Sequence, residues 1–466
     1  MDIPLIGSRG ALWLVSELHL FLAAFILGAP IFIVVCEYLG HRSGDYRYER
    51  LAKEMMRVTA IAYSFTAITG GIFAFILWTS YQSFSQFLFE KFGPAWMIYI
   101  GLIVLEVILM YVYYYSWEPW KDRKMLHIGV GVALNVVGTV VMFIINGIGA
   151  YMLTPTEEAL NWWQMLNNDS WSGLNLHRFI ANITFGGFIA GLFGAFMFLF
   201  SRSEKEKAFY DWMAYIGTLI GVGSLMTLPL AGYIYAKELF LYSATISTFQ
   251  MADRLAPFFV MQGFLITFIF TGVIFYIWTS IRRIEGAERF HRYRTPIFTA
   301  VVLFGTLWIT PANMLPDMVT DPEALGIPVG AVIIPERMAA LSLMMPKALA
   351  VTGILIVTFL TYMIYLRALK TGRITWGSIA PQAQYSLIAV GALIIYLMGL
   401  MGAIRELSRD DWHVAMQIRD MSPYWWVPPL AHTATMTAIA TILFFAVMAF
   451  IFWVGFLLGR KEEVEQ

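Results

Sequence analysis

The chain has 466 residues, of which 59% are hydrophobic and only 13% are charged, and its 31 Lys and Arg residues balance its 31 Asp and Glu residues. This composition has more apolar surface than one water-soluble core can bury, so a bilayer is the expected solvent. The neutral charge balance excludes a basic nucleic-acid-binding face, and the single cysteine, Cys36, excludes a disulfide framework and any Cys-X-X-Cys-His attachment motif.

Eleven apolar segments are long enough to cross a bilayer, which requires about 20 mostly apolar residues per helix. We therefore predict an all-α polytopic membrane bundle of about 11 transmembrane helices, forming a single membrane domain over residues 1–466. No removable signal peptide is expected, because Arg9 is followed by a long apolar stretch without a small-residue cleavage site. In chain order the predicted spans are 12–36, 58–79, 95–115, 127–148, 177–200, 211–235, 256–280, 296–316, 340–366, 383–404 and 430–458.

The distribution of basic residues predicts the orientation of the bundle. Short clusters of Lys and Arg occur in alternate loops, such as 37–57 and 281–295, whereas the other loops carry tryptophans and acidic residues. Because basic loops face the inside of the cell, the N-terminus is expected outside and the C-terminus inside. An odd number of crossings agrees with this N-out, C-in topology.

Two ionisable residues lie deep in predicted spans, where a charge is costly unless it is paired, hydrated or metal-bound. His19 lies seven residues into the first span, roughly 10 Å deep at 1.5 Å per residue. It is either a satisfied core histidine or a metal ligand. Glu106 lies in the middle of the third span and needs a partner there. Since intramembrane carboxylates are often proton relays, we predict that Glu106 carries protons.

Two further candidate sites are expected near the outer surface. His177 opens the fifth span and Met261 lies early in the seventh, so the two side chains form a candidate pair of ligands for one iron. Packing is the alternative role for Met261, because the chain contains 26 methionines. At the end of the tenth span, Glu406 and Arg409 are three residues apart and are expected to share a helix face as an ion pair. His127, at the inside start of the fourth span, is expected to be a cap or interfacial residue.

Together these positions resemble subunit I of the cytochrome bd quinol oxidases over most of residues 8–280 and again over 383–458. The matching motifs are Leu18-His19-Leu20-Phe21, the histidine of the fifth span, Phe259-Val260-Met261, and Glu406-Leu-Ser-Arg409-Asp-Asp-Trp412. The last of these is similar to the family's Glu-X-Gly-Arg-Gln-Pro-Trp, with the Glu, Arg and Trp at the same spacing.

The resemblance implies a cofactor and a role for each of these residues. His19 and Glu406 would ligate two high-spin hemes, while His177 and Met261 would hold a low-spin b heme. Arg409 and Trp412 belong to the same signature, with Arg409 close to the reacting site and Trp412 beside the cofactor. The implied cofactors are two or three b hemes, with heme d as the alternative at one high-spin site, and a quinone. The implied partners are a second membrane subunit, c-type cytochrome subunits or both, in a hetero-oligomeric complex of the inner membrane.

The chain also departs from the family pattern. Ser408, Asp410 and Asp411 replace the Gly, Gln and Pro of the signature, and Tyr99 or Ile100 replaces the first of two glutamates on the third helix. The family's long quinol-binding loop is reduced to about 236–255. An additional helix pair lies within 281–382, between the bd-like helices of 1–280 and the signature region of 383–466. An alternative alignment therefore places Met344 or Met345 in the role of Met261.

Three functions remain open from the sequence. The first is a heme-containing electron-transfer subunit that oxidises quinol or a periplasmic donor and reduces dioxygen. The second is a related module that exchanges electrons between quinone and a c-type cytochrome without reducing dioxygen. The third, a heme-free secondary transporter, also fits many spans with midplane carboxylates.

Overall fold

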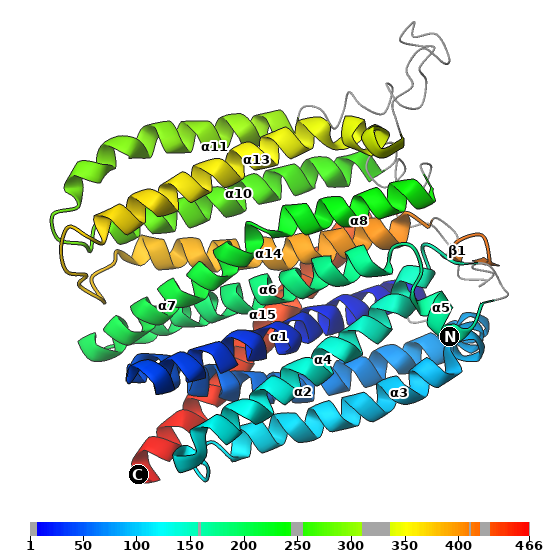
Figure 1. The fold of residues 1–466 in the computed structure, drawn as a ribbon, viewed down its shortest axis with the longest axis horizontal. Helices are drawn as coiled ribbons and strands as arrows, with labels where there is room; N and C mark the ends of the chain where they lie inside the picture. Colours follow the sequence, from blue (N-terminus) through cyan, green and yellow to red (C-terminus); the bar gives the residue numbers. More distant parts are fainter. Residues whose placement is uncertain are drawn as a thin grey trace, which may run out of the picture. The chain divides into compact units, whose positions relative to one another are not determined.

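The structure is a computed structural model that describes residues 7–156, 160–243, 255–309, 336–409, 412–419 and 429–465, with backbone alone for residues 8, 256, 336–346 and 457–465. Nearly all of it is α-helical (Figure 1). The elements are α1 (Gly7–Ser43), α2 (Tyr46–Ser80), α3 (Gln82–Tyr115), η1 (Lys121–Arg123), α4 (Lys124–Tyr151), α5 (Trp162–Leu166), α6 (Trp171–Phe200), α7 (Glu204–Leu225), α8 (Leu228–Tyr242), α10 (Ala256–Ile281), η3 (Glu288–Tyr293), α11 (Arg294–Ile309), α13 (Glu336–Ala368), α14 (Pro381–Leu407), β1 (Trp412–Val414), β2 (Ile418–Arg419) and α15 (Leu430–Glu465).

The all-α polytopic fold is confirmed. Among the described residues, ten helices are long and apolar enough to cross a membrane, and they match ten of the eleven predicted spans. The remaining predicted span, 296–316, begins as α11, whose described part has 16 residues, and continues outside the described residues. The predicted span 211–235 is interrupted at 226–227, just before the first turn of α8, which contains Pro229, because proline cannot continue the hydrogen bonding of the preceding helix.

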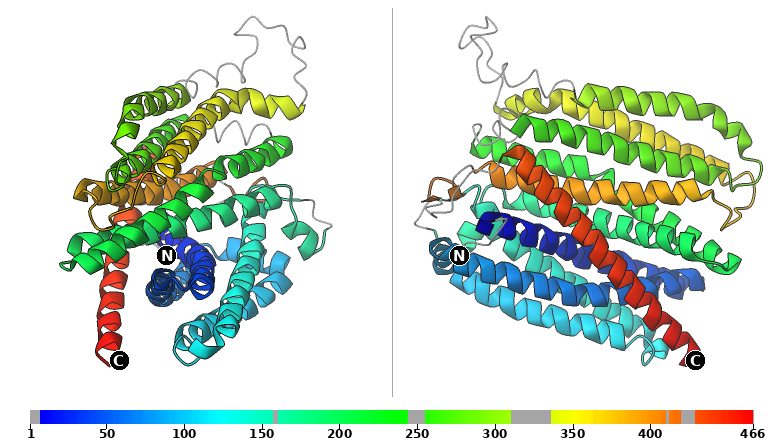
Figure 2. Two further views of the ribbon diagram at one scale, coloured as in Figure 1. Left: turned by 60° about the vertical axis from the view of Figure 1, so that its left-hand side comes forward. Right: turned by 180° about the vertical axis from the view of Figure 1, so that it is seen from behind.

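The chain divides into two compact units. Unit 1 comprises Met1–Ala190, Gly223–Ala231 and Arg409–Gln466, and unit 2 comprises Gly191–Val222 and Gly232–Ser408. In unit 1, α1 packs against α2, α4 and α15, and α3 packs against α2 and α4. The last helix, α15, crosses α1 and α2 obliquely (Figure 2). The start of α1 and the end of α15 lie at opposite ends of this unit (Figure 1).

In unit 2, α10 is the central helix. It packs against α11, α13 and α14, and α11 also packs against α13. A buried ion pair fixes the ends of several segments, since the Arg283 guanidinium, just after α10, bonds to the Asp211 carboxylate of α7. The backbone N–H of Gly377, in the loop before α14, donates to the other oxygen of Asp211 at 2.9 Å. Both ends of the additional segment 281–382 are thereby bonded to α7.

One short feature of unit 1 is not helical. Strand β1, which begins at Trp412 of the signature, and β2 form a small antiparallel hairpin. Ala415 donates its N–H to the carbonyl of Met152 at 2.9 Å, and Tyr151 donates its hydroxyl to the Gln417 side chain at 2.9 Å. The hairpin therefore packs on the end of α4, and the sequence did not predict it.

Close helix contacts in unit 1 depend on glycine. A Cβ atom at Gly28 of α1 would lie only 1.8 Å from the carbonyl oxygen of Asn182 in α6, and one at Gly186 would lie 2.8 Å from the backbone nitrogen of Ala29. Only a residue without a side chain lets the two backbones approach this closely, which is a common means of helix association in membranes.

We expect Gly28→Ala to destabilise the protein, because the added methyl group forces α1 and α6 apart. Overpacking of this kind costs about 1–3 kcal/mol, which a lower midpoint of thermal unfolding in detergent would report. Gly101→Ala is the control, since nothing lies within 4 Å of a Cβ there. An unchanged midpoint for Gly28→Ala would contradict the packing of these helices.

Candidate functional site

His19 lies on α1 and faces α2 within unit 1. Its Nδ1 is 3.2 Å from the backbone carbonyl oxygen of Thr66 and 3.3 Å from the hydroxyl of Thr69. A carbonyl oxygen only accepts hydrogen bonds, so Nδ1 carries the proton and Nε2 keeps its lone pair. Among the described residues Nε2 makes no hydrogen bond. This is the tautomer that a metal-ligating histidine needs, with its second nitrogen oriented by a backbone carbonyl.

The space for the His19 ring comes from Gly70 on α2. A Cβ atom at Gly70 would lie 2.9 Å from Cε1 of His19, whereas the neighbouring Gly71 has nothing within 4 Å of such an atom. Phe73 stacks beside the ring at 6.2 Å between centroids and 25° between planes. The imidazole is therefore held in one orientation by a hydrogen bond, a glycine and an aromatic ring.

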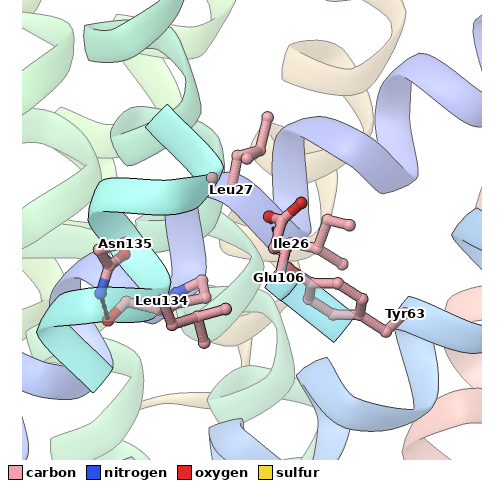
Figure 3. A pocket seen from close by; sticks show the side chains of 8 residues that line it. Ile26, Leu27, Tyr63, Glu106, Leu134 and Asn135 are labelled. Atoms are coloured by element: carbon pink, nitrogen blue, oxygen red, sulfur yellow. Dashed lines mark hydrogen bonds between the residues drawn. The ribbon is translucent and has the colours of Figure 1, made fainter. Parts of the chain in front are cut away.

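Glu106 is buried in the middle of α3, as predicted, and its partner is Tyr63 of α2. The Tyr63 hydroxyl donates to Oε1 of Glu106 at 2.7 Å, and both side chains are buried. They line a small pocket with Ile26 and Pro30 of α1 and Asn135 of α4. Figure 3 shows the Glu106 carboxylate and the Tyr63 ring side by side in this pocket.

Glu106 and His19 both bond to α2, at adjacent turns of that helix. Tyr63, which binds Glu106, precedes Thr66, which binds His19, by three residues, so both lie on one face of the helix. The sequence did not predict these roles for Tyr63, Thr66 and Gly70. The signal was present in the recurrence of Tyr63, Thr66 and Thr69 at intervals of three residues in an otherwise apolar span.

A second carboxylate that sequence analysis did not assign lies close to His19. Glu17 of α1 is buried, and its Oε1 accepts a hydrogen bond of 2.9 Å from the Thr437 hydroxyl of α15. This bond joins α1 and α15, the first and last helices of unit 1, so it contributes to the packing of α15 beside the helix that carries His19.

His177 belongs to the second turn of α6, because the helix begins at Trp171 rather than at His177 as the predicted span implied. A polar network lies beside it. Asn146 of α4 donates to the Asn175 side chain at 2.8 Å and accepts a bond of 2.9 Å from Arg178. These bonds fix the first turns of α6 against the end of α4.

Met261 lies near the start of α10 in unit 2, and its sulfur accepts a contact of 3.6 Å from the Tyr396 hydroxyl of α14. The buried ammonium of Lys347 lies 4.4 Å from the centre of the Phe259 ring, two residues before Met261. His177 belongs to unit 1 and Met261 to unit 2. The side chains of the alternative ligands, Met344 and Met345, lie outside the described residues.

The signature residues occupy the end of α14 and the hairpin. Glu406 is in the last turn of α14, where its carboxylate is 3.2 Å from the guanidinium of Arg405 and 39% exposed. Arg409 lies in the turn beyond the helix end, and its guanidinium donates to the backbone carbonyl of His413. Trp412 begins β1 and is partly buried. Asp410 and Asp411 lie outside the described residues.

The described residues contain no group of three or more His, Cys, Asp and Glu side chains that could hold a bare metal ion. A porphyrin supplies most of the ligands to its own iron, so a heme requires only one or two axial side chains from the protein. The arrangement around His19 suits one such axial ligand to a heme and not a bare metal ion.

Comparisons with known proteins give the same class of protein. The family described as cytochrome bd terminal oxidase subunit I matches residues 8–245. Among solved structures, the bd oxidase from Geobacillus thermodenitrificans has a chain of similar fold, with a TM-score of 0.58 and 13% sequence identity over 97% of this chain and 98% of that chain. No curated protein matches the chain.

The fold and the buried polar residues thus define a multi-pass inner-membrane protein of the electron-transport class. Because the family match covers more than half of its length, the chain belongs to the cytochrome bd terminal oxidase subunit I family and is a bd-type oxidase subunit. This assignment removes the secondary transporter from the functions considered. The family implies hemes, and the oriented imidazole of His19, with its Nε2 lone pair available, fits an axial ligand to heme iron.

We expect Tyr63→Phe to destabilise the protein by about 1–3 kcal/mol, because it leaves a buried carboxyl oxygen of Glu106 without its donor. Chemical unfolding of the purified protein in detergent measures this loss, and a double-mutant cycle with Glu106→Gln isolates the coupling between the two residues. Tyr111→Phe, on the exposed side of α3, is the control. A coupling energy near zero would show that the two groups do not interact.

Proposed function

We propose that this chain is the heme-bearing subunit of a quinol oxidase that passes electrons to dioxygen. The observation that carries the proposal is the fixed tautomer of His19, whose Nδ1 bonds to the Thr66 carbonyl while Nε2 remains available as a ligand. A histidine kept only for packing in a bilayer would satisfy both ring nitrogens, because unpaired polar atoms are costly there.

We assign the remaining ligands by their positions in the family motifs. His19 and Glu406 would hold two high-spin hemes, and His177 and Met261 would hold the low-spin heme, with Met344 or Met345 as the alternative to Met261. These hemes are proposed as two or three of type b, with type d as the alternative at one high-spin site. When bound, they supply one-electron transfer and an open iron position for dioxygen. Arg409 and Trp412 would support the cofactor from the turn and the hairpin.

Glu106 is the proposed proton carrier to the His19 site. Its carboxylate and the Tyr63 hydroxyl form a hydrogen-bonded pair, and the same face of α2 leads in one turn to Thr66 and His19. Each electron that reaches dioxygen on the way to water requires one proton, so a carboxyl group bonded one turn along α2 from the imidazole is well placed to deliver it.

The proposed electron donor is a quinol, and the proposed partner is a second membrane subunit. The family is described as subunit I of the oxidase, which implies at least one further subunit. The exchange of electrons with a c-type cytochrome, without dioxygen reduction, remains the rival outcome of the experiments below.

Gly70→Ala is expected to remove the heme held by His19, because the new methyl group would lie only 2.9 Å from the imidazole Cε1 and force the ring out of its orientation. Reduced-minus-oxidised optical spectra of the purified complex should lose most of one high-spin component while the low-spin b signal remains. Gly71→Ala is a matched control on the same helix and should leave the spectrum unchanged. Identical spectra for the two variants would show that His19 is not a heme ligand.

Carbon monoxide distinguishes an oxidase from an electron-exchange module. An iron with an open position binds carbon monoxide, so the reduced wild-type complex should show a carbon monoxide difference spectrum and consume oxygen with a quinol. Glu406→Gln should abolish oxygen consumption and reduce the carbon monoxide signal to that of the His19 heme, because it removes the carboxylate ligand of the other high-spin heme. If carbon monoxide leaves the reduced wild-type spectrum unchanged, every iron is six-coordinate or inaccessible, and the electron-exchange function replaces the oxidase.

A further inference from the structure

Another buried carboxylate of α1, Glu37, lies towards the opposite end of that helix from His19, inside a polar cluster. Glu37 is fully buried, and its Oε1 is 2.6 Å from Nδ1 of His127 and 3.1 Å from the ammonium of Lys124, both on α4. Its Oε2 accepts a bond of 2.6 Å from the Tyr113 hydroxyl of α3. His127 is also fully buried, so the expectation of a cap or interfacial residue was wrong.

The protonation of His127 follows from its neighbours. Nδ1 faces the Glu37 carboxylate, and Nε2 is 2.8 Å from the backbone carbonyl oxygen of Tyr113. Both partners accept hydrogen bonds, so both ring nitrogens must donate and the ring is an imidazolium when Glu37 is ionised. The cluster therefore holds one proton more than a neutral imidazole and a carboxylate would.

The cluster reaches the surface at the end of the unit where the basic loops lie. Lys124 is 2.5 Å from Glu49 of α2, whose side chain is 36% exposed. Trp117 covers the cluster, with the Lys124 ammonium 4.3 Å from its ring centre and the His127 ring at 4.9 Å.

The groups facing Glu37 are thus His127 and Lys124 from α4 and Tyr113 from α3, with Glu49 of α2 beyond Lys124 and Cys36 adjacent on α1. By the charge-derived orientation this end faces the cytoplasm.

The three helices that form the cluster, α1, α3 and α4, also line the pocket around Glu106. Tyr113 and Glu106 are seven residues apart on α3, which is two turns and about 10 Å along the axis. Pro30, which lines the Glu106 pocket, is likewise seven residues from Glu37 on α1. On α4, Asn135 lies eight residues after His127 and lines the same pocket. Each helix therefore presents one polar group to the cluster and one group to the pocket.

Polar atoms also occupy the interval between the two carboxylates. The Asn135 amide donates to the carbonyl of Pro30 at 3.1 Å and to that of Gly131 at 2.8 Å. Pro30 has no N–H, so the Ile26 carbonyl in the Glu106 pocket lacks the usual helical donor from residue 30. Gly131 lets α4 pack closely against α1 and α3 between the two carboxylates, since a Cβ there would lie 2.5 Å from Val34 and 2.8 Å from the Tyr113 ring.

We propose that the Glu37–His127 pair is a proton-loading site that takes protons from the cytoplasmic side and supplies them to Glu106. In the loaded state the pair is imidazolium and carboxylate. Passing one proton inward leaves neutral imidazole and carboxylate, and one proton from water at the Glu49 end restores the loaded state. No electron moves in either step. The proposal rests on the proposed function, because only dioxygen reduction draws protons through Glu106 to the His19 site.

The test uses the purified holo-complex with Glu37→Gln, Tyr113→Phe and a matched control. Glu37→Gln removes the charge that keeps the imidazolium, while Tyr113→Phe removes only one hydroxyl and preserves the packing of the ring. Glu118→Gln is the control, because Glu118 forms an exposed ion pair of 2.6 Å with Lys53 at the same end of the unit. The Lys53 ammonium lowers the pKa of Glu118, so this carboxylate is ionised like Glu37 but lies outside the cluster.

Two quantities are measured after the fully reduced complex is mixed with oxygen, namely proton uptake with a pH-indicator dye and the pH dependence of its rate. Glu37→Gln should slow uptake at least tenfold, and Tyr113→Phe should move the pH at which the rate is half-maximal, while both keep the wild-type heme and carbon monoxide spectra. Glu118→Gln should match wild type in every measurement.

The outcomes separate this proposal from the proposed function. If wild type consumes oxygen and neither Glu37→Gln nor Tyr113→Phe alters the rate or pH dependence of proton uptake, the cluster is structural and the proposal is overturned alone. If Glu37→Gln fails to assemble, an unchanged pH dependence in the folded Tyr113→Phe variant overturns it. If wild type neither binds carbon monoxide nor consumes oxygen, the proposed function fails and this proposal fails with it.

Discussion

The absence of water in the hydrocarbon core of a bilayer is the constraint on which this structure depends. Every buried ionisable side chain must find its partner on a neighbouring helix, because no solvent is present to replace that partner. The bonds from Glu106 to Tyr63, from Glu17 to Thr437 and from Glu37 to His127 therefore connect α2 with α3, α1 with α15, and α1 with α4. The residues that carry the proposed chemistry are also those that hold unit 1 together.

Helix α2 joins the two kinds of chemistry proposed for this unit. Its Tyr63 bonds to the candidate proton carrier, and its Thr66 carbonyl fixes the tautomer of the candidate heme ligand one turn further along. Gly70 completes the face, since any larger residue would displace the imidazole. A rigid helix presents these groups with more precision than a loop, which suits a site where a proton and an electron must arrive together.

Glycine has a second role in this bundle, at the contact between α1 and α6. The hydrophobic effect gives helices little reason to associate in lipid, so close backbone contact and polar bonds must supply the attraction. Gly28 and Gly186 provide the contact, while Asn146, Asn175 and Arg178 provide the bonds at the end of α6 near His177. The network beside His177 is thus explained as a means of holding α6 in register with α4.

The sequence alone determined the all-α membrane fold, most of its spans and the buried position of Glu106 with its need for a partner, because apolar length and the cost of a buried charge are local properties of the chain. It did not show that α6 begins at Trp171, that a hairpin follows α14, or that His127 is fully buried rather than interfacial. Hydropathy places a residue along a helix but not around its axis. Only the packing of α1, α2, α3 and α4 decided that His19 faces Thr66, that Glu106 faces Tyr63 and that Glu37 faces His127, because those partners are far apart in sequence and meet only when the helices assemble.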